Sequence, residues 1–125
     1  MIFDNNIPIY QQIMEILKQR ILNQEIKPGE LIPSVRTLAI ELNVTTNTVQ
    51  RAYTEMVEEN LLKPVRGVGN KVTGDQKRIN NLRKKYSTEK IKKMYEDLKK
   101  IGTKDDDFQN LIQEFLNQVK SKSLK

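Results

Sequence analysis

The sequence predicts a mainly α-helical protein with one small β-hairpin, built from two successive parts. Apolar residues recur at helical spacing over most of the chain. A stretch near the middle differs, because its apolar residues alternate loosely around a glycine-rich tip. Charge also divides the chain: residues 1–72 carry eight basic and eight acidic side chains, whereas residues 73–125 carry fourteen and eight. We expect an N-terminal domain over residues 1–73 and a helical segment over residues 74–125.

The composition excludes several classes of protein. The chain has no cysteine and no histidine, so it offers no disulfide, no thiolate nucleophile and none of the commonest metal ligands. No apolar run approaches the roughly 18 residues of a membrane span, and the N-terminus does not resemble a signal peptide. Asp105, Asp106 and Asp107 open a predicted helix, where carboxylates favour the positive end of the helix dipole. We expect a cytoplasmic protein that is not an enzyme and uses no metal and no cofactor.

Residues 8–23 have the pattern of a first helix. Pro8 suits the start of a helix, and the Pro28-Gly29 turn separates this helix from the next one. The apolar positions at helical spacing are Ile9, Ile13, Ile16, Leu17 and Ile21.

Two further helices follow, with a tight turn between them. Ser34 suits the N-cap of the second helix, and Asn43 can adopt the left-handed conformation that ends it. Thr45 is the expected N-cap of the third helix, and Asn60 its expected C-cap. The expected buried residues are Val35, Leu38, Ala39 and Leu42 in the second helix and Val49, Ala52, Tyr53, Met56 and Val57 in the third.

Residues 62–72 are expected to form two short strands around Gly67 and Gly69. From Gly74 the chain is lysine-rich and helical, with a bend expected at Ser87-Thr88. Gly102 ends this helix, and the last helix is strongly amphipathic. Two helices joined by a short turn and followed by a hairpin predict a winged helix-turn-helix.

This fold predicts DNA binding, because its third helix can enter the major groove. A glutamine on that helix can pair with adenine and an arginine with guanine. The predicted exposed face of the third helix carries Thr46, Asn47, Gln50, Arg51 and Thr54.

Four segments closely resemble the DNA-binding domain of the GntR family of bacterial regulators. They are residues 8–13 (PIYQQI), 21–30 (ILNQEIKPGE), 31–39 (LIPSVRTLA) and 47–53 (NTVQRAY). The resemblance covers about residues 7–72. The remaining fifty or so residues resemble the short C-terminal segment of the YtrA subfamily.

The resemblance implies roles for individual residues. Arg36 corresponds to a DNA-contacting arginine, Ser34 lies beside the phosphate backbone, and the loop around Arg66 and Gly67 enters the minor groove, where glycine permits close approach. The residues expected to contact DNA are Ser34, Arg36, Thr45, Thr46, Asn47, Thr48, Gln50, Arg51, Arg66 and Gly67.

The sequence departs from the family at three places. Thr46 and Gln50 stand where relatives often carry arginine or lysine, and Asn70-Lys71 replaces an aromatic residue of the wing. The loss of two basic side chains favours an operator richer in A·T pairs. Arg36 has an alternative role as an ion-pair partner of Glu41 or Glu30.

The two-helix segment is expected to join two copies of the chain. A lone small domain cannot cover the apolar face of the last helix; alternatively, that helix folds back on its own N-terminal domain. The expected dimer contacts are Leu82, Tyr86, Met94, Leu98, Phe108, Leu111, Ile112, Phe115, Leu116 and Val119.

The predicted function is that of a sequence-specific regulator. We expect a homodimeric repressor on a pseudo-palindromic operator, and by resemblance to the YtrA subfamily the regulated genes encode an ABC-type transporter. A winged-helix protein-interaction module without operator binding is the alternative, favoured by the zero net charge of residues 1–72. No pattern in the sequence identifies a small-molecule effector.

Overall fold

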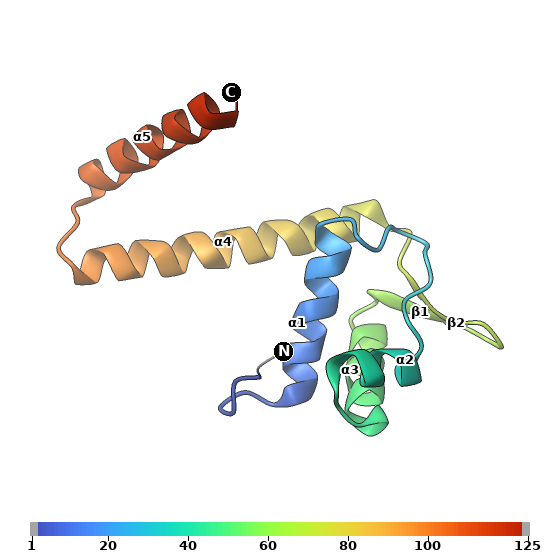
Figure 1. The fold of residues 1–125 in the computed structure, drawn as a ribbon. Coiled ribbons are helices and arrows are strands. Elements are labelled where there is room, and N and C mark those ends of the chain that lie inside the picture. Colours follow the sequence, from blue (N-terminus) through green and yellow to red (C-terminus); the bar gives the residue numbers. More distant parts are fainter. Residues whose placement is uncertain (1–2, 124–125) are drawn as a thin grey trace. The chain divides into compact units, whose positions relative to one another are not determined.

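A computed structural model describes residues 3–123 of the chain. The fold is drawn in Figure 1. The chain divides into two compact units, the first ending at Arg83 and the second beginning at Lys84. The predicted fold class, mainly helical with one small hairpin, is confirmed. The elements are α1 (Ile9–Leu22), α2 (Val35–Leu42), α3 (Thr46–Glu58), β1 (Leu62–Val65), β2 (Gly69–Val72), α4 (Gln76–Lys100) and α5 (Asp105–Ser123).

Helix α1 lies within one residue of its predicted bounds at both ends. Pro8 occupies its N-cap position, with φ −52° and ψ 136°. The side chain of Gln12 secures the preceding turn: its Oε1 accepts from the Asp4 amide at 2.9 Å, and its Nε2 donates to the carbonyls of Asp4 and Ile7 at 2.7 and 2.8 Å. The start of α1 is thereby held against the residues before it.

The predicted caps around the tight turn are confirmed. Ser34 Oγ accepts from the Thr37 amide at 3.1 Å, and Thr45 Oγ1 accepts from the Thr48 amide at 3.3 Å. Asn43 has φ +56°, the left-handed conformation that ends α2. The expected C-cap at Asn60 is wrong by one residue, because the Glu59 amide still donates to the Glu55 carbonyl and the left-handed turn follows at Asn60.

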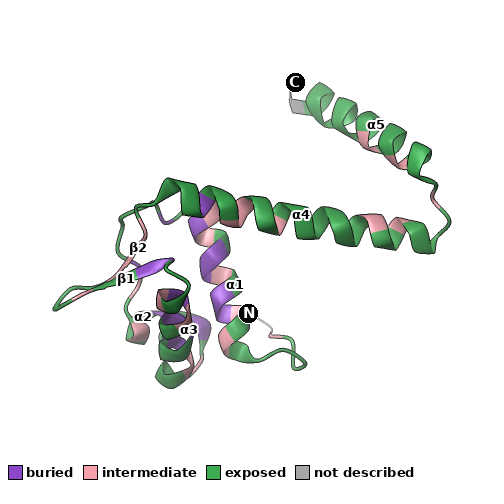
Figure 2. Cartoon of the chain, turned by 180° about the vertical axis from the view of Figure 1, so that it is seen from behind, coloured by how far each residue is buried: buried purple, intermediate pink, exposed green. Residues whose placement is uncertain are grey.

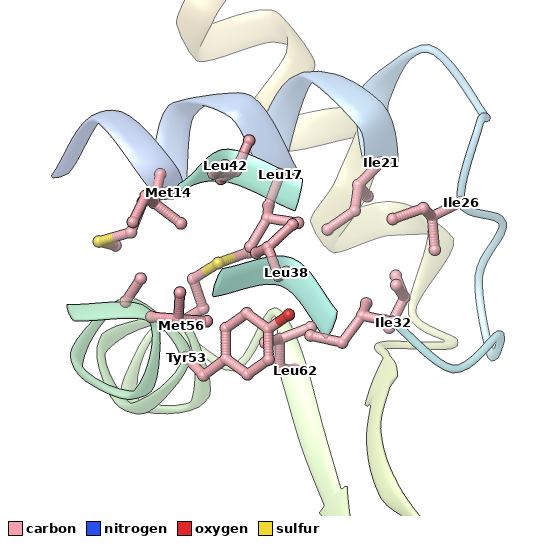
Figure 3. Packing of buried hydrophobic residues seen from close by; sticks show 14 of the residues in the cluster. Met14, Leu17, Ile21, Ile26, Ile32, Leu38, Leu42, Tyr53, Met56 and Leu62 are labelled. Atoms are coloured by element: carbon pink, nitrogen blue, oxygen red, sulfur yellow. The ribbon is translucent and has the colours of Figure 1, made fainter. Parts of the chain in front are cut away.

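The core of the first unit lies between α1, α2, α3 and the base of the hairpin (Figure 3). Tyr53 on α3 is 1% exposed, and its hydroxyl donates to the Pro33 carbonyl at 2.7 Å. Burial raises the pKa of Tyr53, because the interior disfavours the phenolate. Tyr53 therefore ties α3 to the segment just before α2 while keeping its polar group paired. The core residues labelled in Figure 3 are Met14, Leu17, Ile21, Ile26, Ile32, Leu38, Leu42, Tyr53, Met56 and Leu62.

Strands β1 and β2 form the predicted wing, an antiparallel hairpin whose register runs from Leu62↔Val72 to Val65↔Gly69. At its tip the Val68 amide donates to the Val65 carbonyl, and Gly67 has φ +76°, as the third position of a type II turn requires.

A third segment, which the sequence did not predict, lies beside β2. The Gly29 amide donates to the Val72 carbonyl, the Val72 amide donates to the Glu30 carbonyl, and the Ile32 amide donates to the Asn70 carbonyl. The loop before α2 therefore anchors the wing along its second strand.

Helix α4 runs from Gln76 to Lys100 without interruption, so the predicted bend at Ser87-Thr88 is wrong. Serine and threonine lower helix propensity by only a few tenths of a kcal/mol, which the good helix formers around them, Lys84, Lys85, Glu89 and Lys90, outweigh. The first turns of α4 belong to the first unit: Ile79 is 1% exposed, and Arg83 donates to the Leu22 carbonyl at 2.8 Å. The contact boundary thus falls after Arg83, whereas the sequence placed the division at residue 73.

The second unit contains the rest of α4 and α5, joined by a turn in which Gly102 has φ +83°. The rings of Tyr95 and Phe108 meet edge to face, with centroids 5.5 Å apart. Asp105 Oδ1 accepts from Lys99 Nζ at 2.8 Å and from the Tyr95 hydroxyl at 2.9 Å. The two bonds lower the pKa of Asp105, and the bond from Lys99 has the larger effect. Within the described part of the chain, no helix is both long and apolar enough to cross a membrane.

Candidate nucleic-acid interface

Helix α3 has two distinct sides. Val49, Ala52, Tyr53 and Met56 are buried in the core, as predicted. Thr46, Asn47, Gln50, Arg51 and Thr54 are exposed, so the polar side predicted from periodicity is the side that solvent reaches (Figure 2). The Gln50 amide nitrogen donates to Thr54 Oγ1 at 3.3 Å, which leaves its carbonyl oxygen available to a donor such as adenine N6.

The first turns of α2 and α3 carry no acidic residue. In contrast, α5 begins with Asp105, Asp106 and Asp107, which compensate the positive end of its dipole. Ser34 and Thr45 each satisfy one amide of the first turn through a neutral side chain. Helices α2 and α3 therefore keep a positive end that can accept an external phosphate.

Arg36 is exposed on the first turn of α2. Among residues 3–123 it makes neither an ion pair nor a side-chain hydrogen bond, so the alternative of pairing with Glu41 or Glu30 does not hold. Glu41 instead pairs with Arg20 of α1 at 2.6 Å. The guanidinium of Arg36 is thus available for an outside partner.

Arg51 is also exposed, but it has a neighbour that the sequence analysis did not identify. Its guanidinium carbon lies 3.9 Å from the centroid of the Tyr10 ring. Tyr10 is half-buried in the first turn of α1 and packs against the core. The motif at residues 8–13 contains this tyrosine, but nothing in the motif indicates which side chain it touches.

The wing carries the last of the predicted DNA contacts, Arg66 and Gly67, both exposed at its tip. The set of ten predicted residues contains three arginines and no carboxylate. The ten predicted residues therefore carry a charge of +3, from Arg36, Arg51 and Arg66, although residues 1–72 together carry zero. In the part of the chain that the structure describes, no three acidic side chains come together as metal ligands would.

The predicted dimer contacts lie mostly on α5, whose residues are largely exposed (Figure 2). Leu111, Phe115 and Leu116 are 49%, 63% and 43% exposed, and Met94 of α4 is 40% exposed. Phe108 is half-buried against Tyr95, a residue absent from the predicted set. The predicted contacts Leu82, Tyr86, Leu98 and Ile112 are half-buried, and Val119 is exposed.

Known sequences resemble this chain over both its N-terminal domain and most of its length. The sequence profile of bacterial regulatory proteins of the gntR family matches residues 9–72. The uncharacterized HTH-type transcriptional regulator YhcF of Bacillus subtilis is 32% identical over 100 residues, which span 80% of this chain and 83% of YhcF. The HTH-type transcriptional repressor YtrA of the same organism is 39% identical over 70 residues, which span 56% of this chain and 54% of YtrA. The predicted likeness to the YtrA subfamily is confirmed.

Solved structures extend the likeness over most of the chain. A GntR family transcriptional regulator from Listeria monocytogenes matches with a TM-score of 0.82 and 30% identity, over 90% of this chain and 98% of that one. The structure of AraR(DBD) in complex with operator ORX1 matches with a TM-score of 0.55 and 27% identity, over 58% of this chain and 93% of that one. From the profile, the relatives and the fold together, this chain belongs to the gntR family of bacterial regulatory proteins, a family of transcriptional regulators and not of enzymes.

Proposed function

We propose that the chain is a repressor that binds a pseudo-palindromic operator as a homodimer. One observation carries the DNA-binding part: the ten residues predicted to contact DNA lie at the starts of α2 and α3, in the second turn of α3 and at the wing tip, and they include three arginines and no carboxylate. The similar domain AraR(DBD) was solved in complex with an operator, which supports DNA binding by a domain of this fold.

The proposed contacts divide by chemistry. Thr46, Asn47 and Gln50 face base edges from the start of α3, where recognition helices contact the major groove. Arg36 and the first-turn amides of α2 and α3 bind backbone phosphates, which fix the register of the protein on the duplex. Gln50 prefers adenine, so we propose an A·T-richer operator than relatives with arginine at this position would select.

The homodimer is proposed from the apolar face of α5. Leu111, Phe115 and Leu116 form a large exposed apolar surface at helical spacing, and such a surface usually marks an interface. A second copy of the same segment supplies a matching apolar face. Two recognition helices held by one dimer would suit half-sites about one helical turn, roughly 34 Å, apart.

The proposed targets are genes for an ABC-type transporter, in keeping with the likeness to the YtrA subfamily. Binding to bacterial DNA places the proposed action in the cytoplasm. A genome-wide map of bound sites tests both points, because sites away from transporter promoters would contradict the assignment of targets. A small-molecule effector is not part of the proposal.

Binding to duplex DNA at several salt concentrations tests the central proposal. The duplex is one that the chain itself selects from a random-sequence pool. Phosphate contacts predict a steep fall of affinity with salt, whereas the alternative of a protein-interaction module predicts neither selection nor a slope.

Arg36→Ala should weaken binding by about 1–3 kcal/mol, and Gln50→Ala should relax base preference at one position in each half-site. Arg78→Ala is the control. It also removes an arginine, but Arg78 lies on α4, which carries none of the predicted DNA contacts, and its ion pair with Asp75 is long, at 4.0 Å. Equal losses from Arg36→Ala and the control would refute the placement of the interface.

Sedimentation of full-length protein at micromolar concentration tests the dimer. Phe115→Glu places a charge on the apolar face of α5 and should give a monomer with weaker operator binding, because the two half-sites no longer act together. Gln113→Glu adds the same charge at an exposed polar position of α5 and should stay dimeric. A monomeric wild-type protein would refute the dimer.

A further inference from the structure

The contact between Arg51 and Tyr10 joins two helices at the edge of the predicted DNA surface. The distance of 3.9 Å from the guanidinium carbon to the ring centroid is well inside the roughly 6 Å range of a cation–π interaction. Arg51 comes from α3 and Tyr10 from the first turn of α1. The pair lies on the surface, because Arg51 is exposed and Tyr10 is half-buried.

The contact holds the guanidinium and leaves its donors free. In the described part of the chain, Arg51 has no ion pair and donates no side-chain hydrogen bond. A guanidinium that lies over a ring keeps all five N–H groups at its edge, where they match the oxygens of a phosphate. An ion pair with a carboxylate would have occupied those donors.

The position of Arg51 on α3 indicates which ligand these donors would meet. Arg51 follows Asn47 by four residues and Thr48 by three, so the three side chains share one side of the helix. The start of a recognition helix contacts base edges, and residues farther along it and on neighbouring helices contact the backbone.

We propose that Arg51 and Tyr10 form a phosphate-binding pair at the margin of the DNA interface. Arg51 donates to a backbone phosphate, and Tyr10 is the positioning residue that holds the guanidinium in place. This inference rests on the proposed DNA binding and adds α1 to an interface that the sequence assigned to α2, α3 and the wing.

The benefit of the pair is preorganisation. A free arginine side chain loses rotamer freedom when it binds a phosphate, and this loss weakens binding. Tyr10 restricts the side chain before DNA arrives, and the core contacts of Tyr10 fix the ring. Lysine at position 51 would keep the charge but lose both the contact of the guanidinium with the ring and its two-pronged geometry.

Affinity and salt dependence of four single variants test the pair, with the duplex selected by the wild-type chain as the probe. Arg51→Gln should weaken binding by about five- to tenfold and lower the slope of log affinity against log salt by about one. Arg51→Lys should keep the slope and lose affinity. Tyr10→Leu should weaken binding by about two- to fivefold, and Tyr10→Phe, which keeps the ring, should restore most of that loss.

A double variant separates positioning from a general effect on folding. In the Arg51→Gln background, Tyr10→Leu should cause no further loss of affinity, because Tyr10 acts through Arg51. If Tyr10→Leu weakens binding equally with arginine or glutamine at position 51, Tyr10 is only structural and the pair is refuted. Arg78→Gln removes the same charge from α4, which carries none of the predicted DNA contacts, and should leave the slope nearly unchanged.

The outcomes also distinguish this inference from the proposed function. If Arg36→Ala weakens binding while Arg51→Gln changes neither affinity nor slope, the phosphate pair is wrong and operator binding stands. If the wild-type chain selects no duplex, operator binding fails and the pair fails with it.

Discussion

Replacing Ile79 by alanine should destabilise the first unit, although Ile79 lies in a helix that the sequence assigned to another domain. The side chain is 1% exposed and belongs to the core cluster that includes residues of α1 and α3. The substitution removes three carbon atoms, worth about 0.8 kcal/mol each in transfer free energy, and leaves a cavity. The free energy of unfolding should therefore fall by about 3–4 kcal/mol.

Urea denaturation followed by circular dichroism measures this change. With a slope of about 1.5 kcal/mol per molar urea, the midpoint should fall by about 2 M. Ile40→Ala is the matched control, because Ile40 lies on α2 of the same unit but is 75% exposed. Its free energy of unfolding should change by no more than about 0.5 kcal/mol, so its midpoint should stay close to that of the wild-type protein.

Equal midpoints for the two variants would show that the first turns of α4 are not part of the core. The contacts of Ile79 and Arg83 also determine where the chain can be shortened. A fragment ending at Arg83 keeps Ile79 and the bond from Arg83 to the Leu22 carbonyl, whereas one ending at Gly74 loses both. The longer fragment should therefore be the more stable, and a shorter fragment of equal stability would contradict the assignment.

Two other predictions concern the wing and the α4–α5 turn. Gly67→Val should cost about 1–2 kcal/mol in stability, because Gly67 has φ +76°, which a β-branched residue rarely adopts. No clash adds to this cost, since a Cβ at position 67 meets no atom within 4 Å. Its operator affinity should fall further than this strain explains, and unchanged affinity would mean that the tip does not approach DNA. Asp105 should titrate below the usual aspartate pKa in a carbon-13 NMR titration, because its ionised form accepts bonds from Lys99 and Tyr95. A folded pKa below the unfolded value stabilises the turn above about pH 4 and loses this effect as pH falls through the folded pKa. Lys99→Gln should raise the Asp105 pKa, and an unmoved titration would exclude the Lys99 bond.

Local features of the sequence determined most of the secondary structure. The N-caps at Ser34 and Thr45 and the left-handed residue at Asn43 depend on side chains within three residues, so their pattern suffices to predict them. Gly67 marks the wing turn for the same reason, because few other residues adopt a positive φ. The buried side of α3 follows from helical periodicity alone, and its polar side follows with it.

Sequence patterns predicted less well where two features competed. Ser87 and Thr88 weaken a helix only slightly, so their local preference did not decide the course of α4. Asn60 does adopt the left-handed conformation, but one residue after the C-cap, because the amide of Glu59 still donates to the Glu55 carbonyl. Element bounds are sensitive to such single bonds.

Only the tertiary structure decided which distant residues meet. Arg20 rather than Arg36 pairs with Glu41, Tyr10 lies under Arg51, and Ile79 enters the core of the first unit. Each of these contacts joins residues from different helices, and its geometry depends on how those helices pack. A helical pattern identifies which face of α4 is apolar, but it does not identify the surface that covers Ile79, since any apolar surface of the right shape would satisfy the same pattern.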